Sequence, residues 1–85
     1  MKYRSREEII GSILRTASAS QGANKTRIMF SSFLSYPQLE HYLESLISEN
    51  LLECDSKNRV YRTSLNGLNF LELNNKITDL IRIPR

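Results

Sequence analysis

Residues 35–53 read Ser-Tyr-Pro-Gln-Leu-Glu-His-Tyr-Leu-Glu-Ser-Leu-Ile-Ser-Glu-Asn-Leu-Leu-Glu, and this stretch contains a helix with both of its ends marked. Ser35 and Gln38 can form a capping box, and Pro37 stands in the first turn, where a missing amide costs nothing. Asn50 can adopt the left-handed conformation that ends a helix. The apolar residues between these ends recur at helical spacing: Leu39, Tyr42, Leu43, Leu46 and Ile47. The stretch therefore predicts one amphipathic helix, the third in the chain.

Two helices are expected before it. Ser5 and Glu8 form a second capping box, which predicts a first helix that ends near Ala19. Its apolar stripe consists of Ile9, Ile10, Ile13, Leu14 and Ala17. Asn24 is suited to cap a short second helix over roughly residues 25–32. The three residues that follow form a short turn into the third helix.

After the third helix the apolar pattern changes its period. Residues 51–54 and 60–63 are short β-prone runs, and the turn-forming sequence Asp-Ser-Lys-Asn-Arg separates them, which predicts a hairpin. Cys54 in the first strand is expected to be a small buried apolar residue. A last helix begins at Ser64 and ends before Pro84.

The order of these elements, three helices followed by a hairpin, predicts a mainly α fold with a small β-hairpin, the winged helix-turn-helix. In this fold the third helix enters the major groove of a DNA duplex, and the hairpin lies beside the backbone or the minor groove. We expect a winged helix-turn-helix domain over residues 1–63. A C-terminal coiled-coil helix over residues 64–85 is expected to belong to the same folding unit.

Several segments carry a resemblance to a known family. They are Lys-Thr-Arg-Ile-Met at 25–29, Leu-Ser-Tyr-Pro-Gln-Leu-Glu-His-Tyr-Leu at 34–43, Tyr-Arg-Thr at 61–63, and Gly67 near the start of the last helix. Over nearly its whole length the chain resembles a family of small archaeal winged-helix DNA-binding regulators. The resemblance implies an appended C-terminal helix that pairs two protomers through an antiparallel coiled coil.

Composition restricts the classes of function. The 85 residues carry a net charge of +3, which favours polyanionic partners. With one cysteine and one histidine, the chain has no internal disulfide and no zinc site of its own, so no cofactor is expected. No apolar run is long enough to cross a membrane, and the N-terminus lacks the pattern of a secretory signal. We expect a cytoplasmic, nucleoid-associated protein. We do not expect an enzyme, since the sequence shows no catalytic nucleophile, no set of metal ligands and no phosphate-binding loop.

The expected partner is double-stranded DNA, and the candidate contacts lie in three places. At the start of the second helix, free amides and the helix dipole favour phosphate. Near the start of the third helix, off its apolar stripe, side chains can reach base edges. Cations in and after the hairpin loop suit the backbone or the minor groove. The predicted DNA-binding residues are Lys25, Thr26, Arg27, Tyr36, Gln38, His41, Lys57, Arg59 and Arg62.

These assignments have simpler alternatives. Polar residues at a helix start and cations at a loop tip are often only solvated. The capping role of Gln38 competes with base contact. The third helix also carries Glu40, Glu44 and Glu49 and no Lys or Arg, so the cations must come from elsewhere, the N-terminal Lys2, Arg4 and Arg6 included. A winged helix that docks a protein partner through this acidic helix is therefore the second hypothesis.

The last helix carries a second apolar stripe. Phe70, Leu73, Ile77 and Leu80 follow the 3-4-3 spacing of a coiled-coil seam, which predicts a homodimer interface. The alternative is that this stripe folds back onto the first helix. Leu68 and Leu71 lie on another face and are expected to pack on the domain's own core.

Overall fold

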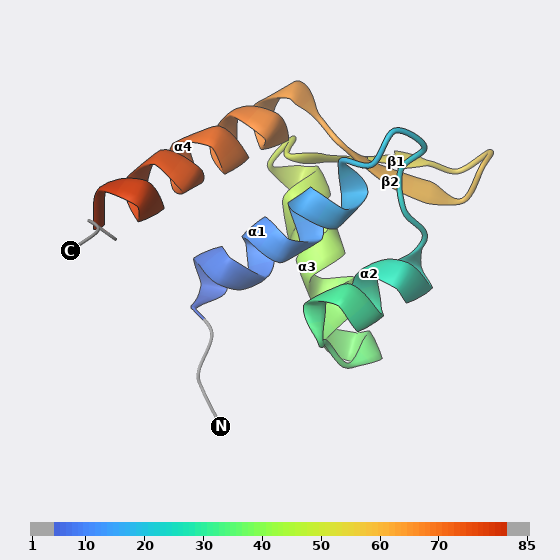
Figure 1. Cartoon of the computed structure of the whole chain (residues 1–85). Helices are drawn as coiled ribbons and strands as arrows, with labels where there is room; N and C mark the ends of the chain where they lie inside the picture. The colour runs from blue at the N-terminus through green and yellow to red at the C-terminus, as the bar shows by residue number, and fades with distance from the viewer. Residues whose placement is uncertain (1–4, 82–85) are drawn as a thin grey trace.

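The computed structural model describes the backbone of residues 5–81 and the side chains of residues 5–73. Three helices enclose the core, a hairpin extends from one side, and a fourth helix lies across the end of the domain (Figure 1). In chain order the elements are α1 (Arg6–Ala17), α2 (Lys25–Ser32), α3 (Tyr36–Ser48), β1 (Leu52–Asp55), β2 (Val60–Thr63) and α4 (Leu65–Ile81).

The helices begin where the capping residues were predicted. Ser5 and Glu8 form both hydrogen bonds of a capping box, at 2.9 and 3.1 Å. Asn24 Oδ1 accepts a hydrogen bond from the amide of Arg27 at 2.8 Å. Asn50 has a φ of 62°, the left-handed conformation expected after α3. The first helix ends at Ala17, two residues before the predicted end, because the Ser18 amide turns back to the carbonyls of the last turn.

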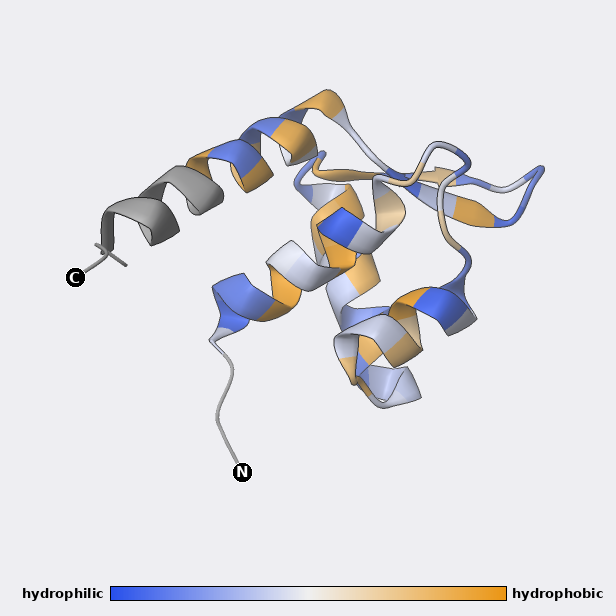
Figure 2. Cartoon of the chain, viewed as in Figure 1, coloured by the Kyte–Doolittle hydropathy of each residue, from blue (hydrophilic) through white to orange (hydrophobic). Residues whose placement is uncertain are grey.

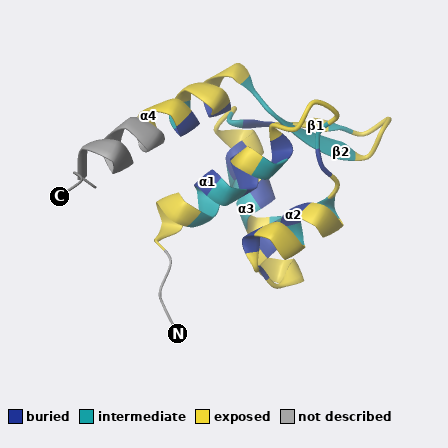
Figure 3. Cartoon of the chain, viewed as in Figure 1, coloured by how far each residue is buried: buried dark blue, intermediate teal, exposed yellow. Residues whose placement is uncertain are grey.

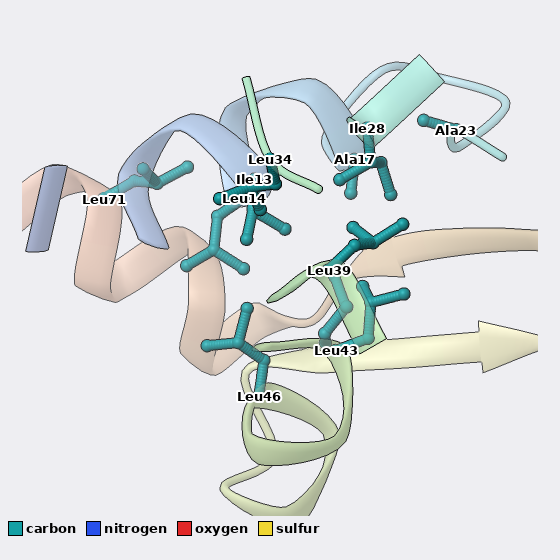
Figure 4. Close-up of a cluster of buried hydrophobic side chains, with 11 residues drawn as sticks. Ile13, Leu14, Ala17, Ala23, Ile28, Leu34, Leu39, Leu43, Leu46 and Leu71 are labelled. Atoms are coloured by element: carbon teal, nitrogen blue, oxygen red, sulfur yellow. The ribbon is translucent and has the colours of Figure 1, made fainter. Parts of the chain in front are cut away.

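The hydrophobic core lies between α1, α2 and α3 and is closed by the start of β1 and by α4 (Figure 4). α1 packs against α2, α4 and β2, while α3 packs against β1. The largest fully buried apolar side chains are Ile13, Leu14, Ile28, Leu39, Leu46 and Leu52. Burial of this kind contributes about 1.5–3 kcal/mol for each large apolar side chain.

The hairpin is joined to the connection between α1 and α2. β1 and β2 are antiparallel, with Leu52 opposite Thr63 and Cys54 opposite Tyr61. Ala23 adds a short bridge to β2, because its amide and carbonyl both bond to the backbone of Tyr61, at 3.0 and 2.7 Å. Gly22 has a φ of 76°, and an added Cβ would stand 2.8 Å from the Tyr61 carbonyl oxygen. The hairpin is therefore fixed relative to the start of α2.

Two predictions about burial are wrong. Cys54 is exposed, although it shares a strand face with the buried Leu52, because the hairpin extends beyond the core (Figure 3). Leu68 is 45% exposed, because α4 contacts the core mainly through the face that carries Gly67 and Leu71.

Apolar residues recur along the first half of α4 (Figure 2), and some of them are exposed. Leu71 is 8% exposed and joins the core, whereas Leu65 and Leu73 are 74% and 62% exposed. Phe70, a predicted seam residue, is half-buried and packs against the domain's own core. The other two predicted seam residues, Ile77 and Leu80, lie outside the part of the chain with described side chains.

Candidate nucleic-acid interface

The start of α2 and the hairpin meet at one open depression. Lys25 and Thr26 contribute from α2, while Arg59 and Tyr61 contribute from the hairpin. The remaining lining residues are Asn24, Cys54, Ser56, Asn58 and Val60. Cations from two separate elements therefore border a single surface, beside the N-terminus of α2. The sequence predicted Lys25, Thr26 and Arg59 as contacts, but not the other lining residues, because nothing in their local pattern indicates that α2 and the hairpin adjoin.

Lys25 is held by α3 as well as by its own helix. Its ammonium forms an ion pair with the Glu40 carboxylate, lies 3.5 Å from the Tyr36 hydroxyl, and stands 5.6 Å from the centre of the Tyr36 ring. The hydrogen bond to Glu40, and after it the one to Tyr36, raise the pKa of Lys25 above its usual range. The same hydrogen bond from Lys25 lowers the pKa of the Glu40 carboxyl. Lys25 is thus a shared cation, for which a phosphate would compete with Glu40.

Three other predicted phosphate-binding cations are not engaged in this way. Arg27 on α2 and Lys57 and Arg59 on the hairpin loop are exposed. None of them forms an ion pair within the described chain. The loop that carries Lys57 and Arg59 is hydrophilic along its tip (Figure 2). Only Arg59 of the three also lines the depression.

Arg62, in contrast, braces the hairpin. Its guanidinium pairs with Asp55 at 3.3 Å, and it lines a different hollow, with Ser20 and Gln21. Hydrogen bonds from the side chain and the backbone of Asn58, and after them from Arg62, lower the pKa of the Asp55 carboxyl. The structure therefore does not bring Arg62 to the depression with the other predicted contacts.

The predicted DNA-contacting side chains on α3 differ in whether they already interact with other residues of the chain. The Gln38 side-chain oxygen accepts a hydrogen bond from the Ser35 amide at 3.0 Å, so the capping role is occupied. His41 is exposed and packs edge-on against Tyr42, with ring centres 6.2 Å apart. Tyr36 is 54% exposed. Of the N-terminal cations, Arg6 lies 5.8 Å over the Tyr42 ring, while residues 2 and 4 are outside the described part of the chain.

The side chains of residues 5–73 also bear on metal binding. Among them, no three His, Cys, Asp or Glu side chains are grouped closely enough to hold a metal ion. No helix in the described part of the chain has the length and apolarity to cross a membrane.

The arrangement of α1–α3 with the β1–β2 hairpin defines a winged helix domain. The family model described as winged helix-turn-helix matches residues 3–82, and the chain therefore belongs to the winged helix-turn-helix family. Membership of this family indicates DNA binding in general. No curated protein matches the sequence.

Proposed function

We propose that this protein binds double-stranded DNA as a transcriptional regulator or architectural protein, with α3 in the major groove. The observation that carries the proposal is the shared depression, where Lys25 on α2 and Arg59 on the hairpin border one surface. Exposed Arg27 and Lys57 stand on the same two elements. Resemblance of the sequence to small archaeal winged-helix regulators supports a regulatory role.

The parts of this surface have separate tasks. The start of α2 and the hairpin hold the phosphate backbone, with the hairpin on the backbone or in the minor groove. Tyr36, Gln38 and His41 face the bases from the start of α3. Arg62 contributes by holding the hairpin in shape through Asp55. Because α3 supplies no Lys or Arg, the affinity for DNA depends on the cations outside this helix, and we expect it to be modest and sensitive to salt.

A titration with random-sequence duplex DNA at several salt concentrations tests this proposal. The double variant Lys57→Glu/Arg59→Glu should bind all sequences more weakly, and the dependence of log affinity on log salt should flatten by about 0.9 for each phosphate that is no longer neutralised. Arg15→Glu is a control for a single charge reversal away from this surface, because Arg15 is an exposed cation on α1 that lines neither hollow. Equal reductions in affinity for the control and the double variant would contradict the assigned surface.

A homodimer through α4 is part of the proposal. Leu73 supports it, because this predicted seam residue is 62% exposed on a helix that continues to Ile81. A protomer of 85 residues also has a small core that association would stabilise. Two-fold symmetry would present two α3 helices to a palindromic or two-site target.

A protein-binding winged helix is the second candidate. The observation that favours it is the exposed surface of α3, where Glu44 and Glu49 are exposed and no cation is present. A docked partner would then be basic. The salt titration separates the two candidates, because duplex affinity that does not change with salt favours the protein-binding module.

The remaining parts of the proposal concern what the protein does not do and where it acts. We propose a binding protein without catalytic activity or cofactor, in which His41 contacts DNA rather than serving as a base. Such a protein acts with chromosomal DNA, in the nucleoid of the cytoplasm.

A further inference from the structure

One side of α3 faces away from the core and forms the surface that would enter a major groove. Pro37, His41, Glu44 and Ser48 follow one another at steps of four, three and four residues, so they lie on a single helix face. All four are exposed, and the buried leucines 39, 43 and 46 occupy the opposite face. Glu44 lies near the middle of this outward face.

The two carboxylates in the middle of α3 differ in their surroundings. Glu40 is neutralised by Lys25 across the gap between α2 and α3. Glu44, one turn later, is exposed, and no residue of the described chain forms a hydrogen bond or an ion pair with it. Glu44 is therefore the uncompensated negative charge on the outward face of α3.

The chemistry of base edges restricts what such a charge can meet. In the major groove, guanine presents two acceptors, thymine presents an acceptor and a methyl group, and adenine presents its donor beside an acceptor. Cytosine presents a donor, its N4 amino group, and carboxylates pair with it for this reason. A carboxylate in the groove is therefore less favourable opposite guanine, thymine or adenine than opposite cytosine. Near a phosphate it is repelled.

We infer that Glu44 is a specificity-determining residue that accepts a hydrogen bond from a cytosine N4 amino group, so that the preferred target contains a C·G pair opposite it. The inference rests on the proposed function and makes it more specific. Glu44 then limits affinity for random DNA and at the same time selects the sequence. The pairing of Glu40 with Lys25 keeps the neighbouring carboxylate from adding a second repulsive charge.

The test is a selection of bound sequences from a random duplex pool, made with the wild type, Glu44→Gln and Glu44→Ala. The wild type should select cytosine at one position of each half-site. Glu44→Gln should select adenine there, because an amide pairs with adenine in a bidentate way. Glu44→Ala should lose the preference at that position alone and bind random duplex more tightly. Glu49→Gln is the matched control, since it removes an exposed carboxylate at the end of the same helix and should leave the preference unchanged.

A second measurement uses duplex in which the selected cytosine carries an N4-methyl group, which keeps base pairing but removes the donor from the groove. Wild-type affinity should fall about fivefold or more, as for a mismatched position, and the affinity of Glu44→Ala should not fall. A cytosine preference that survives in both Glu44 variants overturns the inference, as does wild-type binding without any cytosine preference. A wild type that shows no salt-dependent duplex binding overturns the proposed function as well, and so the two failures are distinguishable. Circular dichroism of the exposed-site variants confirms that each is folded.

Discussion

Replacing Glu40 with glutamine should convert Lys25 from a shared cation into a free one. In the wild type, the ion pair with Glu40 holds the Lys25 ammonium against α3, beside the Tyr36 hydroxyl. Glu40→Gln removes the charge and keeps the size of the side chain. The lysine at the start of α2 then becomes available to a DNA phosphate.

The size of the effect follows from the number of cations that are free. Of the four cations at the start of α2 and on the hairpin loop, Arg27, Lys57 and Arg59 remain when Lys25 is engaged. At about 0.9 per phosphate, these three contribute about −2.7 to the slope of log affinity against log salt for each protomer. Release of Lys25 should change this contribution to about −3.6. When the salt concentration rises from about 50 to about 200 mM, the ratio of the duplex affinity of Glu40→Gln to that of the wild type should therefore fall about 3.5-fold.

Fluorescence anisotropy with a labelled random duplex over this salt range measures both slopes. Glu49→Gln has the same change in net charge without touching Lys25, and it should leave the slope unchanged. In a Lys25→Gln background, Glu40→Gln should no longer steepen the slope. Equal slopes for the wild type and Glu40→Gln, or the same steepening without Lys25, would refute the competition between Glu40 and phosphate.

Three further predictions concern pH, the fold and the dimer. The Glu40 carboxyl should titrate below the usual glutamate range in an NMR pH titration, chiefly because of its hydrogen bond with Lys25 and after it the one with Tyr36. Its contribution to stability is present at neutral pH and is lost as the pH falls through this lowered pKa, and removal of Lys25 should raise the pKa toward the usual range. Gly67→Ala should destabilise the fold by about 1–3 kcal/mol in urea unfolding. The reason is that the new Cβ would overlap a backbone carbonyl oxygen, whereas the exposed Asn66→Ala should have little effect. Leu73→Asp should sediment as a monomer if α4 pairs two protomers, and Leu65→Asp, at an exposed position outside the predicted seam, should remain a dimer.

The elements that sequence predicted well are those that local chemistry specifies. Ser5, Asn24 and Ser35 cap the helices they were expected to cap, because a capping side chain bonds to an amide only a few residues away. The left-handed Asn50 is a similar case, since its conformation depends on the residue itself.

Contacts between distant residues could not be predicted in the same way. The pairing of Lys25 with Glu40 depends on the angle at which α2 meets α3, and neither residue's neighbours reveal it. The exposure of Cys54 depends on how far the hairpin extends past the core, although the alternation of the strand correctly puts Leu52 inside. The acidic character of α3 was visible in the sequence, but which of its carboxylates is neutralised was not.

The backbone bridge between Ala23 and Tyr61 has a consequence for the thermodynamics of binding. It joins the residue just before the α2 cap to the strand that follows Arg59, so the helix start and the hairpin arm move as one body. Much of the ordering entropy that a flexible arm would lose on meeting a duplex is therefore already lost during folding. Association with DNA should accordingly show a small penalty in conformational entropy. The spacing between the two cationic elements is set by the fold before DNA binds.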